Sequence, residues 1–75
     1  MPNVKTIRDI LAVYFGETIA ENAIESICQD LNIKKGEVSK DEFKRLSMAV
    51  YFQIRKGMGK DTAEKFLKEL DGMVK

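Results

Sequence analysis

The longest periodic stretch of the chain runs from Ser39 to Lys56 and reads SKDEFKRLSMAVYFQIRK. Ser39 and Glu42 have the spacing of a capping box, in which each side chain bonds a backbone N–H that the first helical turn leaves unpaired. Apolar residues then recur three and four positions apart, at Phe43, Leu46, Val50 and Ile54. This spacing predicts one face of a long α-helix that ends near Lys56, before the break at Gly57 and Gly59.

A second apolar stripe runs along the same predicted helix. Met48 and Phe52 lie four residues apart and point almost opposite to the first face, with Ala49 and Tyr51 on the flanks. A helix that is apolar on most sides is usually packed by neighbours all round, so we expect this helix to be central and Phe52 to be covered by another helix. We expect an interface contribution from Met48 and Tyr51. The alternatives are that Met48, Tyr51 and Phe52 together form a partner or dimer interface, or line a ligand pocket.

Two shorter helices are predicted before this stretch. The first carries Ile7, Ile10, Leu11 and Tyr14 on one face, with a cap pattern at Thr6 and Asp9 and a terminating Gly16. The second opens with a capping-box pattern at Thr18 and Glu21. Its apolar stripe consists of Ala20, Ala23, Ile24, Ile27 and Leu31. The segment from Asn32 to Val38 contains Gly36 and is predicted to be a loop.

A fourth helix is predicted after Gly59, with Asp61 and Glu64 as its cap pattern. One side of it carries Ala63, Phe66, Leu67, Leu70 and Val74. The connections are short, which favours antiparallel neighbours. The sequence therefore predicts an all-α fold, a compact four-helix bundle-like single domain over residues 1–75 with a long central third helix.

The segment Gly36–Phe43 (GEVSKDEF) resembles the second half of an EF-hand calcium loop. In that family a glycine turn precedes a hydrophobic residue, a polar helix start and an acidic ligand, here Glu42. The resemblance implies a helix–loop–helix shape. The first half departs from the pattern, because Leu31, Ile33 and Lys35 stand where the family has oxygen ligands. We therefore expect no metal ion at this loop.

A second segment, Gln53–Lys60 (QIRKGMGK) followed by Ala63 and Phe66, resembles the turn of a repressor-type helix-turn-helix. There a glycine follows the first helix, and the next helix lies in the major groove of DNA. The resemblance implies phosphate contacts from Arg55, Lys56, Lys60, Lys65 and Lys68. The chain departs from the motif at Gln53, where a small residue is usual. We expect an ordinary turn between packed helices, with nucleic-acid binding as the alternative.

The net charge of +1 combines two unlike halves of the chain. Residues 9–33 contain five acidic residues and no Lys or Arg, whereas residues 34–68 contain ten basic and five acidic residues. Such halves attract each other within one molecule or head-to-tail between molecules.

Residues that usually perform catalysis are scarce. The chain has no His, and Cys28 is its single cysteine, which excludes an intrachain disulfide and leaves no usual base for a thiol nucleophile. We expect Cys28 to be buried, and we expect no catalytic residues, no cofactor and no metal site. The lone cysteine favours a reducing, cytoplasmic location.

No apolar run reaches the roughly 18 residues of a membrane span, so we expect no membrane partner. We also expect no signal peptide before the fold.

The function predicted by these observations is a non-enzymatic protein–protein interaction or regulatory module that binds an unidentified protein or a second copy of itself. The alternative is a small nucleic-acid-binding domain with a helix-turn-helix-like segment around residues 53–66. The interface residues of the first hypothesis are Met48, Tyr51 and Phe52, and those of the second are Arg55, Lys56, Lys60, Lys65 and Lys68.

Overall fold

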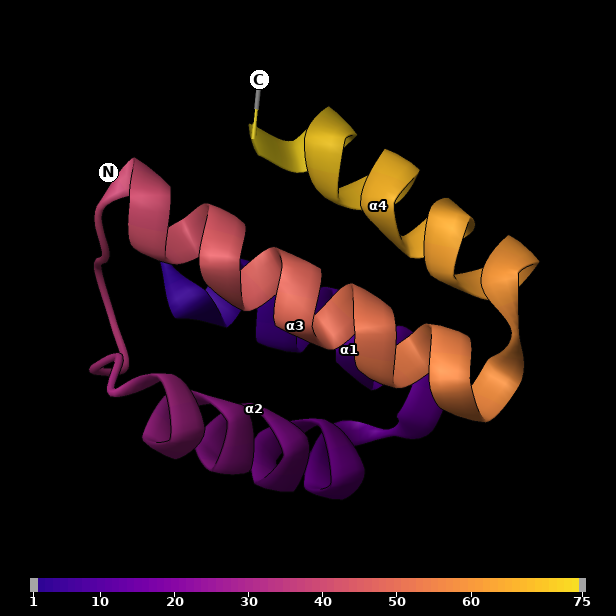
Figure 1. Ribbon diagram of the computed structural model, residues 1–75, viewed down its shortest axis with the longest axis horizontal. Helices are drawn as coiled ribbons and strands as arrows, with labels where there is room; N and C mark the ends of the chain where they lie inside the picture. The colour runs from indigo at the N-terminus through magenta and orange to yellow at the C-terminus, as the bar shows by residue number, and fades with distance from the viewer. Residues whose placement is uncertain (1, 75) are drawn as a thin grey trace.

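Four helices account for most of the chain in the computed structural model, which describes the backbone of residues 2–74 and the side chains of residues 2–72 (Figure 1). They are α1 (Val4–Phe15), α2 (Glu17–Leu31), α3 (Lys40–Met58) and α4 (Lys60–Val74). Over these residues the elements are all helical apart from a single isolated β-bridge. The predicted all-α fold with four helices and a long third helix is confirmed.

The helices form two hairpins that pack against each other. α1 packs on α2 and α3 packs on α4, and the hairpins meet through α1 with α4 and α2 with α3. In Figure 1, α3 lies between α2 and α4, with α1 behind it. The Cα radius of gyration is 11.1 Å, close to the roughly 11 Å expected for a compact domain of this length. In this arrangement α3 packs against α4 on one flank and α2 on the other, and its inner side faces the shared core.

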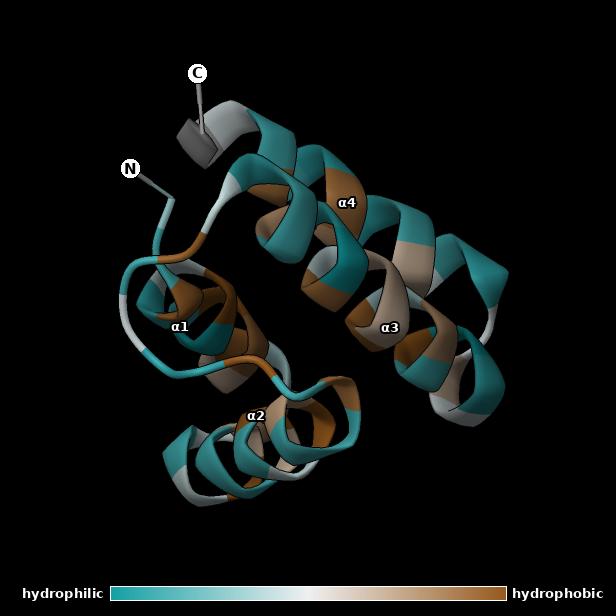
Figure 2. Cartoon of the chain, turned by 60° about the vertical axis from the view of Figure 1, so that its left-hand side comes forward, coloured by the Kyte–Doolittle hydropathy of each residue, from teal (hydrophilic) through white to brown (hydrophobic). Residues whose placement is uncertain are grey.

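One cluster of buried side chains fills the space between the helices. Its members come from every helix and from the loop before α3. They are Val4, Ile7, Ile10, Leu11, Ala20, Ile24, Ile27, Cys28, Ile33, Val38, Phe43, Leu46, Val50, Tyr51, Ile54, Ala63, Phe66 and Leu70. Figure 2 shows the hydrophobic segments of the ribbons lying mainly toward this interior. Most residues of the predicted inner faces therefore belong to the core, whereas Tyr14, Ala23, Leu31 and Leu67 are only half-buried at its edge. The side chain of Val74 lies outside those that the structure describes.

Single glycines join the helices within each hairpin. Gly16 (φ 87°) follows α1 and precedes α2, and Gly59 (φ 97°) does the same between α3 and α4. At each glycine the N–H donates back into the helix that ends and the carbonyl accepts from the helix that begins. A positive φ is a conformation that glycine adopts at little cost, so one residue suffices to reverse the chain.

This one-residue connection corrects several predicted helix ends. Thr18 lies inside the first turn of α2, which has Gly16 as its N-cap and no side-chain cap. Asp61 likewise lies inside the first turn of α4. Gly57 is helical, so α3 continues to Met58 and only Gly59 breaks it.

The cap of α1 is also displaced from its predicted position. Asn3, not Thr6, precedes the helix, and its side-chain oxygen accepts a hydrogen bond from the N–H of Lys5 at 2.9 Å. The predicted capping box of α3 is confirmed. The N–H of Glu42 donates to the Ser39 hydroxyl, and the N–H of Ser39 donates to the Glu42 carboxylate, both at 3.1 Å.

The segment before α1 is fastened to the loop between α2 and α3. The N–H of Val4 donates to the Gly36 carbonyl and the N–H of Val38 donates to the Pro2 carbonyl, each at 2.9 Å. Gly36 has φ 106°, and Val38 and Ile33 insert into the core. The loop is thereby an ordered connection with its own hydrophobic anchors, and the helix–loop–helix shape implied by the EF-hand resemblance is present.

Candidate functional site

Groups able to hold a metal ion or act as a nucleophile do not assemble in the part of the chain that the structure describes. No cluster of three or more Cys, Asp or Glu side chains has metal-binding geometry there. Glu42, which stands at the acidic ligand position of the EF-hand resemblance, caps α3 instead. Cys28 is buried, as predicted. Burial raises the pKa of its thiol, and the charge of Lys35 opposes that effect only in part, so the unreactive neutral form is favoured.

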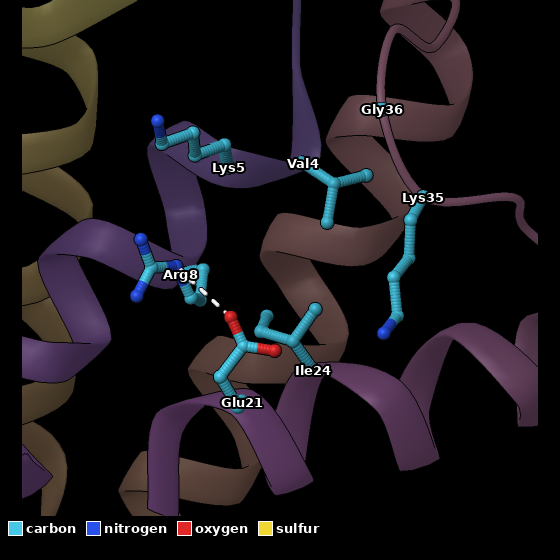
Figure 3. Close-up of a pocket in the computed structure, with 7 residues that line it drawn as sticks. All are labelled: Val4, Lys5, Arg8, Glu21, Ile24, Lys35 and Gly36. Atoms are coloured by element: carbon cyan, nitrogen blue, oxygen red, sulfur yellow. Dashed lines mark ion pairs between the residues drawn. The ribbon is translucent and has the colours of Figure 1, made fainter. Parts of the chain in front are cut away.

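A small pocket of about 210 Å³ lies beside the first turn of α1 (Figure 3). Its charged walls come from α1, α2 and the following loop, and its lining residues are Val4, Lys5, Arg8, Glu21, Ile24, Lys35 and Gly36. In Figure 3 a dashed line joins Arg8 to the Glu21 carboxylate, with Nε and Oε1 3.4 Å apart. Arg8 also pairs with Asp9, and Lys35 Nζ lies 3.7 Å from Glu25 Oε1. These ion pairs offset the charges of Arg8 and Lys35, whereas Lys5 is exposed and forms no ion pair with another described residue.

Two shallow grooves lie elsewhere between helices. One of about 180 Å³ lies among α1, α2 and α3, with an apolar lining that includes Phe15, Ile19 and Val50. Ile19 is 59% exposed. The other lies between α1 and α4, beside Val13 and the carboxylates of Asp9 and Glu69. Neither groove contains a charged group directed inward from a buried position among the residues described. They are openings between packed helices and carry no chemistry of their own.

The outer face of α3 combines exposed apolar side chains with cations. Phe52 is 55% exposed and Met48 is 37% exposed, so the prediction that another helix covers Phe52 is wrong. Tyr51 is 9% exposed and belongs to the core, which removes it from the predicted interface. The Phe52 ring meets the Tyr51 ring edge-on, with centroids 5.4 Å apart. A four-helix arrangement leaves each helix one outward face, and on α3 that face carries Phe52.

Four cations surround these two apolar side chains. Lys44 and Arg45 precede Met48 by about one turn, and Arg55 and Lys56 follow Phe52 by the same interval. All four are exposed, and none forms an ion pair with another of the described residues. One carboxylate, that of exposed Asp41, lies on the same side of α3, one turn before Lys44 and Arg45. We use the term α3 outer face for the set Lys44, Arg45, Met48, Phe52, Arg55 and Lys56.

The structure does not bring the predicted nucleic-acid contacts onto one carboxylate-free face. Arg55 and Lys56 lie on the last turns of α3, whereas Lys60, Lys65 and Lys68 lie on α4. On α4 the lysines alternate with exposed Asp61, Glu64 and Glu69, and Lys60 Nζ is 3.8 Å from Glu64 Oε2.

The geometry of α3 and α4 also departs from a helix-turn-helix. Figure 1 shows the two helices side by side and running in opposite directions. A DNA-binding helix-turn-helix instead crosses at about 90–120° through a turn of three or four residues. The segment 53–66 is therefore the corner of a helical hairpin, in which Gly57 belongs to the first helix.

Comparisons with known proteins give no relative for this arrangement. The chain shows no significant match to a protein-family model, to a curated protein or to a solved structure. In addition, no helix in the described part of the chain has the length and apolar character needed to cross a membrane.

Proposed function

We propose that this domain is a non-enzymatic protein–protein interaction module that binds its partner through the α3 outer face. The observation that carries the proposal is the exposure of Met48 and Phe52 at the centre of that face, between two pairs of unpaired cations. Phe, Met and Arg are enriched in protein interfaces, and binding energy concentrates on aromatic anchors near their centre. Covering Phe52 would remove a large apolar surface from water, which is the main driving force of association.

The rest of the molecule supplies a rigid support for this face. α3 is fixed by its capping box at one end and by Gly59 at the other, and its inner face is fully buried at Leu46 and Val50. A preorganised helix loses little conformational entropy when a partner docks on it. The lone buried Cys28, which needs no oxidising surroundings, supports the further proposal of a cytoplasmic location.

Site-specific photo-crosslinking tests this proposal. A photoreactive phenylalanine analogue replaces Phe52 in one variant and Gln29, an exposed residue of α2, in the control variant. In a native lysate we expect discrete protein adducts from position 52 that excess unmodified domain abolishes, and no such adducts from position 29. The same adducts from both positions, or none from position 52, would contradict the proposal.

Nucleic-acid binding is the second candidate function, and the unpaired cations of the α3 outer face favour it. Contacts of this kind are electrostatic and weaken steeply with salt. A labelled DNA duplex that gains anisotropy with the domain at low salt and loses it at moderate salt would support this candidate. We expect no such change, because the cations of α4 share their surface with carboxylates.

A further inference from the structure

We infer that the α3 outer face binds an acidic amphipathic helix of another protein. This inference rests on the proposed function and specifies the chemistry of the partner. The apolar side of the partner helix would cover Met48 and Phe52, and its carboxylates would meet Lys44 and Arg45 at one end and Arg55 and Lys56 at the other.

The spacing on α3 sets the pattern required of the partner. Met48 and Phe52 are one turn apart, about 6 Å along the helix, and the cations extend this face to about 18 Å between Lys44 and Lys56. A helix lying along α3 therefore needs two apolar anchors three or four residues apart. It also needs acidic residues about one turn before the first anchor and one turn after the second.

The backbone of α3 excludes recognition by strand addition. Its N–H and C=O groups are bonded within the helix, so α3 offers a partner side chains only. The isolated bridge between Asn3 and Glu37 precedes α3, belongs to the loop that fastens the N-terminal segment, and is the one β-type pairing among residues 2–74. A partner helix satisfies its own backbone hydrogen bonds and can present anchors and carboxylates on one side.

A second copy of this chain does not fit the same face. Two α3 outer faces placed together would oppose like charges at both ends. Of the four acidic residues of α2, Glu21 already pairs with Arg8 and Glu25 with Lys35. The other two, Glu17 and Asp30, are 13 residues apart and lie on different sides of α2, so they do not form one acidic face. A contact between α2 of one copy and α3 of the next would also be head-to-tail, a type of contact that forms an open filament unless it closes a ring.

A lipid surface fits this face less well than an acidic helix. Helices that lie in a membrane interface insert a continuous apolar side, whereas the exposed apolar part of this face consists of Met48 and Phe52 alone. The core side of α3 is occupied by Leu46, Val50 and Ile54, so the helix cannot rotate to offer more.

Peptide binding to the full domain tests the inference. The probe is a fluorescein-labelled, covalently stapled helical peptide with Leu and Phe anchors four residues apart and Glu residues one turn beyond each anchor. One control peptide has Gln in place of every Glu, and another has Ser in place of both anchors. We expect the acidic peptide to bind at least about tenfold more tightly than either control at low ionic strength. We also expect its affinity to fall several-fold between about 0.05 and 0.5 M salt.

Variants of the domain locate the binding site. Phe52→Ser with Met48→Ser, and separately Lys44→Glu with Arg45→Glu, should each weaken binding of the acidic peptide by about tenfold or more. Ile19→Ser changes another exposed apolar residue and Lys65→Glu changes another exposed cation, so both should leave the affinity within twofold of the wild-type value.

Several results would overturn the inference. Equal affinity for the Glu and Gln peptides would show that the partner need not be acidic. Equal losses of affinity in Ile19→Ser and in Phe52→Ser with Met48→Ser would show that the peptide does not bind at the α3 outer face. Displacement of the bound peptide by a DNA duplex or by phosphatidylserine vesicles at lower concentration than unlabelled peptide would assign the face to those ligands. If the peptide fails to bind while crosslinks from position 52 persist, the acidic-helix inference is wrong and the proposed function stands.

Discussion

Tyr14 and Cys28 are two side chains that the fold holds in their neutral forms. Burial is the main cause of the raised pKa of Tyr14, and the neighbouring Glu69 carboxylate raises it further. The Tyr14 hydroxyl oxygen is buried without a well-aligned hydrogen-bond partner among the described residues. Burial also raises the pKa of Cys28. In both cases folding opposes loss of the proton, so the free energy of unfolding falls as the pH rises through the pKa values of these side chains.

The first prediction concerns the alkaline limb of stability. Because the pKa of Tyr14 is higher in the folded state, its contribution is fully present below the unfolded value of about 10 and is lost as the pH rises through the folded value. Tyr14→Phe should therefore flatten the fall of the melting temperature above about pH 10. At pH 7 it should change the unfolding free energy by less than about 1 kcal/mol, because the hydroxyl has no well-formed hydrogen bond to lose. Parallel melting curves of wild type and variant from pH 7 to 11 make the comparison. If the melting temperatures of the two proteins fall equally steeply above pH 10, Tyr14 is not the cause of the loss of stability.

At the helix starts, some caps predicted from the sequence are present in the structure and others are not. The capping box at Ser39 and Glu42 was predictable because both partners lie within one turn of each other and a seven-residue loop precedes them. The patterns at Thr18 and Asp61 look similar in sequence, but each follows a glycine whose positive φ starts the helix sooner. A local pattern specifies a cap only where the preceding connection leaves that residue outside the helix.

The second prediction follows from this difference. Ser39→Ala removes the acceptor of the Glu42 N–H and should lower the free energy of unfolding by about 1 kcal/mol. Thr18→Ala serves as the matched control, because Thr18 is exposed, lies within the first turn of α2 and makes no cap hydrogen bond. It should change the free energy by less than about 0.5 kcal/mol. Urea titrations give the free energy of unfolding of each variant. Equal decreases in the two variants would show that α2 also depends on a side-chain cap.

The third prediction concerns the loop between α2 and α3. Its EF-hand-like half supplies Glu42, which is engaged with the Ser39 N–H, and Leu31, Ile33 and Lys35 offer no side-chain carboxylate. Calcium requires six to eight oxygen ligands. Millimolar calcium should therefore leave the melting temperature within about 1 °C of its value in chelator, since only a ligand of the native state shifts unfolding. Magnesium at the same concentration controls for ionic strength. A rise of several degrees that is specific to calcium would reveal coordination by backbone oxygens.

At the scale of the whole molecule, the arrangement of the helices decides which apolar residues become core. The inner face of α3 was predictable because Phe43, Leu46, Val50 and Ile54 repeat with the helical period. Periodicity cannot show whether that face or the stripe of Met48 and Phe52 is buried, because both stripes have the same spacing. The outcome depends on how many neighbours surround α3, and in two packed hairpins its outer side has none. The candidate site is therefore the stripe of α3 whose exposure is decided by tertiary packing and not by the local sequence pattern.

The last prediction tests that arrangement directly. Burial of an unpaired carboxylate costs several kcal/mol, more than a domain of this size can lose. Phe52 is 55% exposed, so Phe52→Asp leaves its carboxylate in water, within one turn of Arg55 and Lys56. The variant should remain helical and lose about 1 kcal/mol or less, chiefly from the edge contact with Tyr51. Leu46→Asp is the comparison, because Leu46 is fully buried on the same helix and its replacement should unfold the domain. Circular dichroism melts of the two variants separate the cases. Unfolding of Phe52→Asp to the same degree as Leu46→Asp would mean that Phe52 is a core residue, and the α3 outer face would then be closed to any partner.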